Sequence, residues 1–250
     1  MPPTQPAAGH AADRAGLSPG ATPLGPRIVL VPGLGLDRRS WSRVLPRLAA
    51  AGVPAEVALL PGMGRPVAVP PLEELAGLLR ARLGRGPVVL TGHSQGCQVV
   101  AAVGDDPRVA GVVLLGPSTD PRLRSPLGLA LRWLATAVRE PLWQLPLVLA
   151  QWTRTGPGRM RALWRQTSPD DIDRRLERVA VPVVVVRGDR DRLCDADWAR
   201  ALAAAAPAGR LVELAGAAHM TVQTRPDAVA ALLVERSRAA ARAQQAGDRP

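Results

Sequence analysis

The sequence of 250 residues contains no Lys, Asn, Phe or Tyr, and only two Ile. The codons of these residues are AT-rich, whereas those of Ala, Gly, Pro and Arg are GC-rich, so the composition indicates a GC-rich genome. Because Lys is absent, the formal net charge of +11 rests on Arg alone and partly reflects this codon bias. The arginines are scattered, without a run of like charges, and the sequence therefore does not predict a nucleic-acid-binding protein.

Long apolar stretches are also missing. No uninterrupted run reaches about 18 residues, so the sequence predicts no transmembrane helix. A secretory signal begins with basic residues followed by an apolar run, and the sequence that starts Met-Pro-Pro-Thr lacks both. We therefore expect no secretory signal and a location in the cytoplasm. Two cysteines, Cys97 and Cys194, are too few for a disulfide framework or a zinc site and are expected to be buried free thiols. With three His and no cluster of metal ligands, we expect neither a metal nor another cofactor.

The most informative stretch that is present spans residues 88–100. A short apolar run is followed by Gly-His-Ser-Gln-Gly and then by a helical pattern of small residues. This is G-x-S-x-G between a strand and a helix, the context that holds a serine on a sharp turn, although an ordinary Gly-rich turn is the alternative. Gly92 and Gly96 bring no Cβ into the crowded contact. Ser94 would then lie at a strand end, over helical N–H groups that favour negative charge.

Apolar runs alternate with amphipathic segments along most of the chain, which predicts an α/β fold with a doubly wound, mostly parallel sheet. Residues 118–179 break this rhythm and carry four of the six Trp on helical patterns separated by Pro, so we interpret them as an inserted helical cap. The core then comprises residues 27–117 and 180–241, between a flexible N-terminal tail (1–26) and a C-terminal tail (242–250). Strands are expected at 27–31, 56–60, 88–91, 109–115, 181–186 and 210–214, and helices at 40–51 (capped by Ser40), 71–83, 196–206 and 226–241, with another ending near residue 103.

A serine hydroxyl becomes a strong nucleophile when a histidine, itself fixed by a carboxylate, takes its proton. His10 lies in the N-terminal tail, and His93 belongs to the serine turn and is expected to point away from the place of a base. His219 follows the last strand, and the carboxyl ends of parallel strands face one crevice, where ligands bind. His219 is therefore the candidate base for Ser94.

The carboxylate is expected at the same edge of the sheet. Asp191 follows the strand at 181–186 and is the favoured candidate. The order Ser94, Asp191, His219 along the chain is the one expected for a nucleophile on such a turn. The alternatives at this edge are four further acids: Asp120, Asp189, Asp195 and Asp197.

A tetrahedral intermediate at Ser94 requires N–H donors aimed at its oxyanion. The backbone of Gln95, directly after the serine, is expected to supply one donor. The backbone of Leu34, in the Gly-Leu-Gly turn after the first strand, is expected to supply the other. The alternative for the second segment is a plain Gly-rich turn.

These motifs together resemble the α/β-hydrolase family over roughly residues 27–236. Val31 to Gly35 resembles the family's oxyanion turn, and Leu60 to Arg65 resembles its P-G-x-G-x-S loop. The sequence at 92–96 resembles its nucleophile elbow, and Gly188 to Asp191 its G-x-x-D acid loop, which selects Asp191 over Asp189. Ala218-His219 stands where the family commonly has Gly-His. The resemblance implies the fold and a Ser-His-Asp triad, without defining a substrate.

The chain also departs from the family pattern. Pro32 stands where the oxyanion turn usually has His, which removes a hydrogen bond that steadies the turn, although a backbone donor is expected to survive. Pro66 replaces a small Ser, and Ala218 replaces a Gly. The family's first two strands have no evident counterpart, so a shortened sheet is expected. A Ser nucleophile, rather than Asp or Cys, argues against dehalogenases and dienelactone-type hydrolases.

The cap offers the few clues to a ligand. Trp133, Trp143, Trp152 and Trp164 would roof the crevice and suit an apolar acyl or ring portion, or they hold the cap helices together. Three cap arginines are candidates to meet an anionic group, with codon bias as the alternative explanation: Arg122, Arg124 and Arg132. Two methionines either line the pocket or fill space: Met63 and Met220.

The sequence thus predicts an enzyme that cleaves a small, apolar carboxylic ester, thioester or lactone through an acyl-enzyme on Ser94. Its expected partner is a small-molecule substrate with an apolar portion, and neither a nucleic-acid partner nor a membrane span is expected. The same triad also serves acyltransferases, C–C bond hydrolases, lyases and cofactor-free perhydrolases, because fold alone does not choose the reaction. A protein of another class, which binds a ligand in the pocket for signalling with little turnover, remains an alternative.

Overall fold

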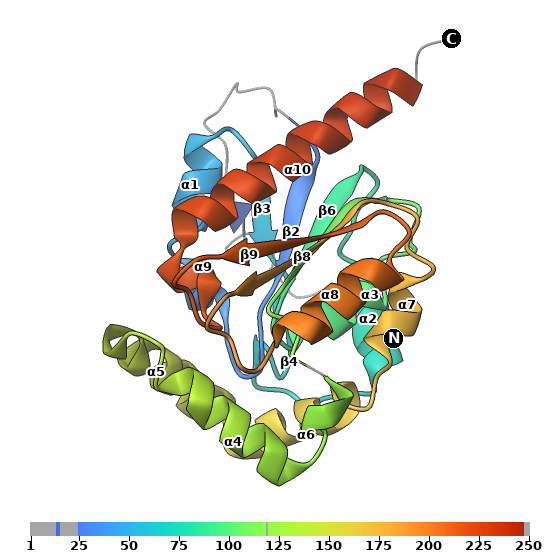
Figure 1. Ribbon diagram of the computed structural model, residues 1–250. Coiled ribbons are helices and arrows are strands. Elements are labelled where there is room, and N and C mark those ends of the chain that lie inside the picture. The colour runs from blue at the N-terminus through green and yellow to red at the C-terminus, as the bar shows by residue number, and fades with distance from the viewer. Residues whose placement is uncertain (1–13, 16–24, 119, 248–250) are drawn as a thin grey trace, which may run out of the picture.

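A computed structural model describes residues 14–15, 25–118 and 120–247. Figure 1 shows a central sheet between helices, with strand order β1-β3-β2-β6-β7-β8-β9. Every neighbouring pair is parallel except β1 with β3, which confirms the doubly wound, mostly parallel sheet. The strands are β1 (Arg14–Ala15), β2 (Arg27–Val31), β3 (Ala55–Val57), β6 (Val88–His93), β7 (Val109–Leu115), β8 (Val183–Gly188) and β9 (Gly209–Leu214).

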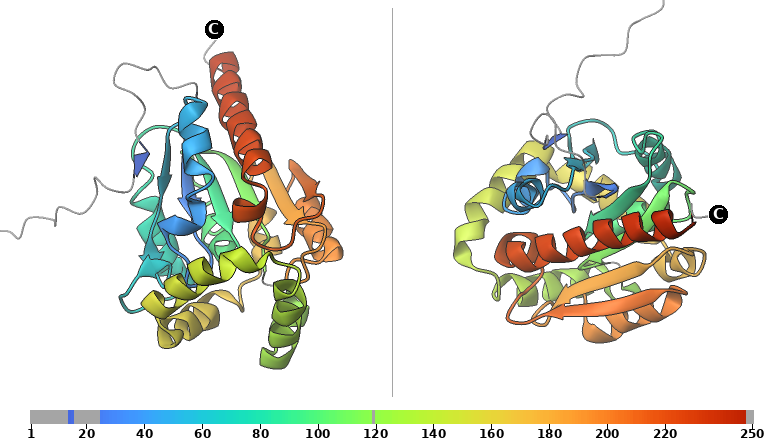
Figure 2. Two further views of the ribbon diagram at one scale, coloured as in Figure 1. Left: turned by 90° about the vertical axis from the view of Figure 1, so that its left-hand side faces the viewer. Right: turned by 90° about the horizontal axis from the view of Figure 1, so that it is seen from above.

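Both faces of the sheet are covered, which explains why its central strands are apolar at successive positions. Side chains alternate along β2: Val29 and Val31 pack into one core, and Ile28 and Leu30 into the other. The first core lies under α2 (Leu72–Arg80), α3 (Gly96–Ala101), α7 (Ile172–Leu176) and α8 (Ala196–Ala205). The second lies under α1 (Leu45–Ala50), α9 (Thr221–Thr224) and α10 (Pro226–Gly247) (Figure 2).

A group of helices between β7 and α7 lies beside this sandwich, at the lower end in Figure 1. It contains the 3-10 helices η2 (Pro121–Leu123) and η3 (Leu142–Gln144), and the helices α4 (Pro126–Ala137), α5 (Leu145–Thr155) and α6 (Pro157–Thr167). Each of α4, α5 and α6 has Pro in its first turn, where the missing N–H costs nothing. These helices fall within the segment expected to form the cap. No helix in the described part of the chain is long and apolar enough to span a bilayer.

The helix expected over 40–51 is wrong in its first half. The chain forms a 3-10 helix, η1 (Arg38–Trp41), and only then α1. Asp37, rather than Ser40, caps η1 by accepting from the Arg39 N–H, whereas Ser40 lies inside it. Pro46 in the first turn of α1 has no N–H to donate to residue 42, so one continuous helix cannot form.

The strand expected at 56–60 ends at Val57. Leu60–Pro61 (β4) instead pairs with Gly64–Arg65 (β5) as a small separate sheet, which Gly62 and Gly64 permit with φ near +77°. A Cβ on Gly62 would also lie 3.1 Å from the Leu163 Cβ of α6, so the loop packs closely against this helix, and only Gly adopts these angles without strain.

Both predicted tails need correction. Arg14–Ala15 forms β1 at the sheet edge, so the expected tail over 1–26 contains a strand, and residues 1–13 and 16–24 lie outside the described residues. At the other end, α10 continues to Gly247, because residues 239–246 are Ala, Arg and Gln, which favour helix. Of the predicted tail 242–250, only residues 248–250 lie outside the described residues.

Candidate active site

Ser94 occupies the turn between β6 and α3. Its φ of +52° is the only positive value for a non-Gly residue in the described part of the chain. This costly conformation is held on both sides, because the Ser94 N–H donates to the Leu115 carbonyl at 2.8 Å and its own carbonyl accepts from the Cys97 N–H at 3.0 Å. A Cβ on Gly92 would lie 2.7 Å from the Cys97 Cα, and one on Gly96 would lie 2.5 Å from the Pro32 oxygen. The two glycines are therefore required by the turn.

Replacing Gly96 with Ala is expected to destabilise the protein by at least about 2 kcal/mol, because the backbone of Pro32 must move to admit the new methyl group. Gly77 offers a matched control on α2, because a Cβ there meets nothing within 4 Å. Gly77→Ala should raise the free energy of unfolding by about 0.5–1 kcal/mol. Urea unfolding of the two variants measures this contrast, and equal stability of both would contradict the account.

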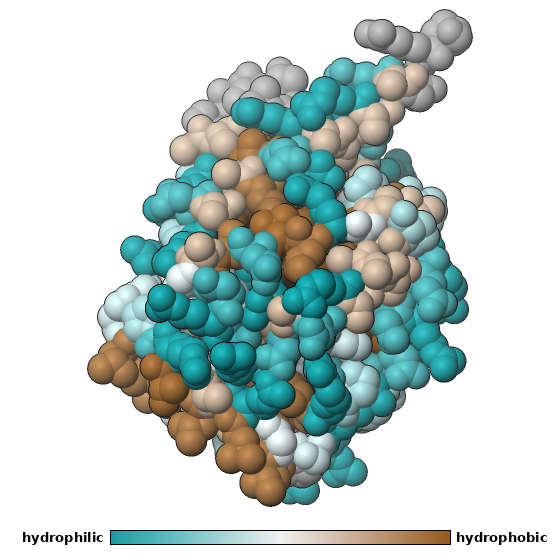
Figure 3. Space-filling model, in the orientation of Figure 1, coloured by the Kyte–Doolittle hydropathy of each residue, from teal (hydrophilic) through white to brown (hydrophobic). Residues whose placement is uncertain are grey.

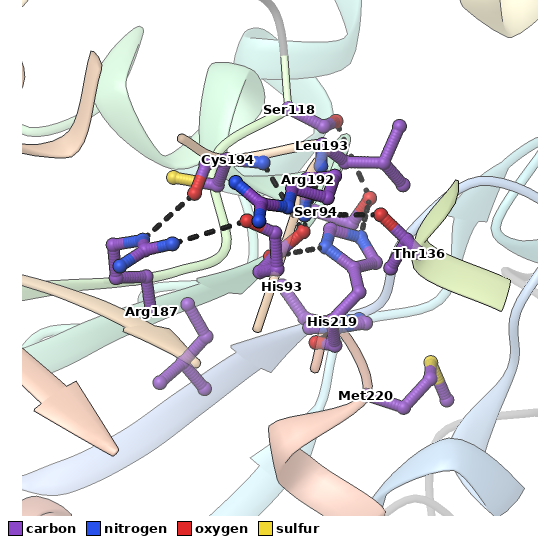
Figure 4. Close-up of polar contacts among 12 residues, drawn as sticks. His93, Ser94, Ser118, Thr136, Arg187, Arg192, Leu193, Cys194, His219 and Met220 are labelled. Carbon is purple, nitrogen blue, oxygen red and sulfur yellow. Dashed lines mark hydrogen bonds and ion pairs between the residues drawn. The ribbon is translucent and has the colours of Figure 1, made fainter. Parts of the chain in front are cut away.

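The structure brings Ser94, Asp191 and His219 together at the carboxyl edge of the sheet. Figure 4 shows Ser94 beside His219. His219 Nε2 lies 2.9 Å from Ser94 Oγ, and His219 Nδ1 lies 2.8 Å from Asp191 Oδ2. Ser94 follows β6, Asp191 follows β8 and His219 follows β9. A proton donated by Nδ1 to the carboxylate leaves Nε2 as an acceptor facing the serine hydroxyl.

Asp191 is held from several directions and is fully buried. Its Oδ1 accepts from the N–H groups of Leu193 and Cys194, at 2.8 and 3.2 Å. The buried Arg187 at the end of β8 donates to the Asp191 carbonyl at 3.0 Å and to the Cys194 carbonyl at 2.8 Å, and Figure 4 shows the contact with Cys194. Arg187 therefore holds the backbone of the loop that carries Asp191 without touching the carboxylate. No sequence motif indicated this role for Arg187.

Gly116, at the end of β7, makes room for the histidine and carboxylate. Its φ is +59°, and a Cβ there would lie 3.0 Å from His219 Nδ1 and 3.3 Å from Asp191 Oδ2. A side chain at this position would therefore press on the pair.

The competing acids do not join this group, and three of them pair with arginines. Arg122 forms an ion pair with Asp120, and Arg132 forms one with Asp195. Arg124 pairs with Asp171, so the three cap arginines proposed to meet an anionic ligand each have a carboxylate partner already. The remaining pair is Arg200 with Asp197, and Asp189 is exposed. Of the other histidines, His10 lies outside the described residues.

The turn at Gly33–Leu34 lies directly against the serine. A Cβ on Gly33 would lie 3.0 Å from the Ser94 Cβ. Within the described residues, neither the Leu34 nor the Gln95 N–H donates to a backbone carbonyl in a turn, loop or cap. Both predicted donors, the Leu34 and Gln95 N–H groups, are therefore not used in such a backbone hydrogen bond.

Side chains of helix α5 support the turn after β2. In this turn Pro32 stands where the α/β-hydrolase family, which the sequence resembles, usually has His. The Trp152 indole donates to the Leu34 carbonyl at 3.2 Å, and the Thr155 hydroxyl donates to the Gly35 carbonyl at 2.9 Å. The Gln151 side chain accepts from the Asp37 N–H at 2.8 Å. Three side chains from α5 thereby hold the loop after β2.

Ser94 and His219 open into a cavity of about 460 Å³, within the range of small-molecule sites. Trp133 and Trp152 lie against each other in its wall, with ring centroids 5.6 Å apart. Trp143 lies outside the cavity, and Met63 is buried in the core, whereas Met220 lines the cavity. The wall is mainly apolar, and six of its side chains are Leu129, Trp133, Val148, Trp152, Met160 and Trp164.

Comparison with known proteins identifies the group to which the chain belongs. A family model described as the alpha/beta hydrolase family matches residues 28–232. The chain is a member of this family. No curated protein sequence matches it.

Solved structures share the fold at low identity. A hydrolase from Oleispira antarctica superposes with a TM-score of 0.70 at 15% identity, covering 84% of this chain and 90% of that one. An enol-lactonase from Burkholderia xenovorans superposes with a TM-score of 0.67 at 22% identity, covering 85% of this chain and 91% of that one. A bromoperoxidase from Bacillus anthracis superposes with a TM-score of 0.65 at 18% identity, covering 85% of this chain and 92% of that one. At these identities the likeness shows the fold alone.

The two buried histidines of this alpha/beta hydrolase have opposite electrostatics. Burial lowers the pKa of His219, but the charge of Asp191, its hydrogen bond and the charge of Glu140 outweigh burial, so the pKa lies above its ordinary value. Burial, with the charge of His219, lowers the pKa of His93 to about 3. His93 therefore stays neutral and donates from Nε2 to the His219 carbonyl at 3.2 Å, which steadies the backbone at His219.

Glu140 is a pocket residue that the sequence did not single out. It accepts from the Met220 N–H at 2.6 Å and from the Gln144 amide at 2.9 Å, and its charge acts on His219. Glu140→Gln removes this charge and is expected to lower the pKa of His219, as measured by an NMR titration of the imidazole. Glu74→Gln, on the exposed face of α2, should leave it unchanged. An unchanged or higher His219 pKa in Glu140→Gln would refute this assignment.

Ser118, after β7, is a second residue that sequence reasoning missed. Its hydroxyl lies 3.3 Å from Ser94 Oγ and donates to Gln95 Oε1 at 2.9 Å. The Gln95 amide then donates to Thr167 Oγ1 on α6 at 3.0 Å. This hydrogen-bond chain ties the serine turn to the helices above it. Its only sequence signal is that Ser118 is the first hydroxyl after the end of a central strand.

Metal-ligating side chains do not gather elsewhere in the described ranges. Within them, no group of three or more His, Cys, Asp or Glu is arranged to hold a metal ion. Cys97 and Cys194 are both buried free thiols, and burial raises the pKa of each.

Proposed function

We propose that this protein is a serine hydrolase that cleaves a small, apolar carboxylic ester, thioester or lactone through an acyl-enzyme on Ser94. One observation carries the proposal: the continuous hydrogen-bonded line from Ser94 Oγ through His219 to Asp191, at 2.9 and 2.8 Å, on the floor of an apolar cavity. A serine, a base and an orienting carboxylate in this geometry support nucleophilic acyl transfer.

In the first half of the reaction, Ser94 Oγ attacks the substrate carbonyl carbon and passes its proton to His219 Nε2. The carbonyl π electrons move to oxygen, and the Leu34 and Gln95 N–H groups donate to that oxyanion. Asp191 stabilises the imidazolium and keeps its orientation. When the oxyanion collapses, the bond to the leaving group breaks, and His219 returns the proton to the alcohol or thiol that departs.

In the second half, water takes the place of the leaving group. His219 accepts a proton from water as its oxygen attacks the acyl carbon, and the same donors hold the second oxyanion. Collapse breaks the bond to Ser94 Oγ, which recovers its proton from His219, and the carboxylic acid leaves. This scheme uses only groups of the chain and water, and we propose no metal or cofactor for it.

The cavity supports an apolar acyl group as the preferred portion of the substrate. Trp133, Trp152 and Trp164 line it together with Leu and Val side chains, and two of its polar side chains, Ser118 and His219, lie 3.3 and 2.9 Å from Ser94 Oγ. Its volume of about 460 Å³ suits a small molecule rather than a polymer. Arg122, Arg124 and Arg132 already pair with carboxylates, so these three side chains give no reason to expect a carboxylate or phosphate on the substrate.

A panel of nitrophenyl esters with increasing acyl length tests this proposal. The rate should rise with chain length until the cavity is filled and then fall, and each progress curve should begin with a burst of nitrophenol equal to the enzyme present. A folded protein that binds these esters without turning over any of them would contradict a hydrolase and favour the ligand-binding alternative.

Product analysis separates hydrolysis from related reactions on the same acyl-enzyme. The neighbours of similar fold include an enol-lactonase and a bromoperoxidase, so water and peroxide are both chemically reasonable second nucleophiles. We propose water, and the carboxylic acid should remain the main product when an alcohol or hydrogen peroxide is added. Predominant ester or peracid formation would instead identify an acyltransferase or a perhydrolase.

A further inference from the structure

Helix α4 is apolar on two opposite faces. Its inner face lines the cavity with Leu129, Trp133 and Thr136. Its outer face carries an apolar stripe at spacings of four, three and four residues, and each of these side chains is 56–71% exposed. The outer stripe consists of Leu127, Leu131, Leu134 and Val138. A helix that is apolar all round is normally covered on all sides, so this outer face lacks a partner within the chain.

A second stripe continues this surface on η3 and α5. Its side chains are 45–77% exposed and consist of Leu142, Trp143, Leu145 and Leu149. We name the two stripes together the cap face. In Figure 3 hydrophobic side chains gather along the lower left edge of the molecule, where Figure 1 places α4 and α5. Among the large exposed apolar residues of the described chain, only Val67 and Leu78 lie outside this helical segment. Such a concentration marks an interaction surface.

The cap face lies in the most cationic part of the chain. Residues 121–168 contain eight Arg and one Glu, so their formal charge is 8 − 1 = +7 of the total +11. Within the described residues, no carboxylate forms an ion pair with five of these arginines: Arg139, Arg154, Arg159, Arg161 and Arg165. Arg139 directly follows the stripe on α4, and Arg154 lies near the end of α5. Arg43 also lies over the Trp143 ring, 4.9 Å from its centroid.

This combination of charge and apolar surface selects the occupant. A second copy docked through the same face would place the unpaired arginines of one cationic segment near those of another. A neutral apolar partner would leave the arginines unmatched. An anionic lipid surface accepts Leu and Trp side chains at its interface and offers phosphates to the arginines around them. We propose that the cap face docks this protein on anionic lipid membranes.

The cavity has its opening beside the cap face. Trp133 and Leu145 both line the cavity and are exposed, so they form part of its rim. Docking would therefore bring the mouth of the cavity next to the lipid. The docking proposal does not rest on the chemistry proposed above, because Ser94→Ala should bind lipid as well as the wild type.

Sedimentation of the full chain with lipid vesicles tests the proposal. The wild type should partition into vesicles of equal parts phosphatidylcholine and phosphatidylglycerol about tenfold more strongly than into phosphatidylcholine alone, and added salt should weaken this binding. The triple variant Leu127→Gln/Leu131→Gln/Leu134→Gln should reduce the partition by about tenfold or more. Arg139→Gln/Arg154→Gln should reduce the preference for anionic vesicles.

The matched control is Val67→Gln/Leu78→Gln, which removes exposed apolar residues away from the cap face and should bind as the wild type does. Thermal unfolding confirms that each variant is folded. Equal partition of the wild type and the triple variant would overturn the proposal, as would no binding to anionic vesicles. Light scattering that shows a dimer in the wild type and a monomer in the triple variant, without vesicle binding, would assign the cap face to a second copy instead.

Discussion

Replacing Ser94 with Ala is expected to lower kcat/KM for an ester substrate by about 10⁵–10⁶-fold, because the variant has no nucleophile on the turn. His219→Ala should cost a similar factor, since the hydroxyl then has no base at 2.9 Å. The two groups act as one unit, so the double variant should lose no more than either single variant. Steady-state kinetics of the three proteins measures this.

The comparison has an internal control in protein stability. Ser94 holds a strained φ of +52° through backbone hydrogen bonds that Ala retains, so Ser94→Ala should unfold near the wild-type temperature. Loss of activity with a normal unfolding transition then reports chemistry rather than folding. Losses that multiply in the double variant would show that the two side chains act independently and would contradict the shared mechanism.

Asp191→Asn should lower kcat/KM by about 10⁴-fold. The Asn oxygen can still accept from the Leu193 and Cys194 N–H groups, but its amide then faces His219 Nδ1 with a donor. The imidazole is pushed toward the tautomer with its proton on Nε2, which cannot take the serine proton. The removed charge also withdraws a contribution that raises the pKa of His219.

Asp189→Asn is the matched control for this variant, because Asp189 lies two residues away in the same loop and is exposed. It should keep wild-type kinetics. A large loss of kcat/KM in Asp189→Asn, together with a small loss in Asp191→Asn, would show that Asp189 rather than Asp191 orients His219.

The sheet could be predicted from the sequence because its strands are continuous runs of Val, Leu and Ile with Gly or Pro at their ends. The strand at 109–115 matches β7 at both ends. The proximity of Ser94, Asp191 and His219 followed from the same pattern, because each lies in the loop or turn that follows a parallel strand. The helix predicted over 40–51 was wrong in its first half, because Pro46 is placed in the first turn of α1 and the helix does not continue before it.

Other features depend on contacts between residues far apart in the chain, which spacing does not reveal. Glu140 acts on His219 through such a contact. Arg187 is only four residues from Asp191, but its hydrogen bonds to the carbonyls of Asp191 and Cys194 depend on how the loop folds back on itself, which no motif indicates. Ion pairs also changed the role expected for three arginines, because Arg124 and Arg132 pair with the distant Asp171 and Asp195, and Arg122 with the neighbouring Asp120. The outward stripe on α4 has a sequence period, but the sequence alone does not show which side of the helix the cavity occupies.

Labelling with a small fluorophosphonate probe tests whether Ser94 is an activated nucleophile. We expect one covalent adduct, located on Ser94 by peptide mass analysis. The adduct should be absent from Ser94→Ala and His219→Ala, and should form more slowly in Asp191→Asn than in Asp189→Asn. Labelling that persists in Ser94→Ala, or a folded wild type that never reacts, would contradict this expectation.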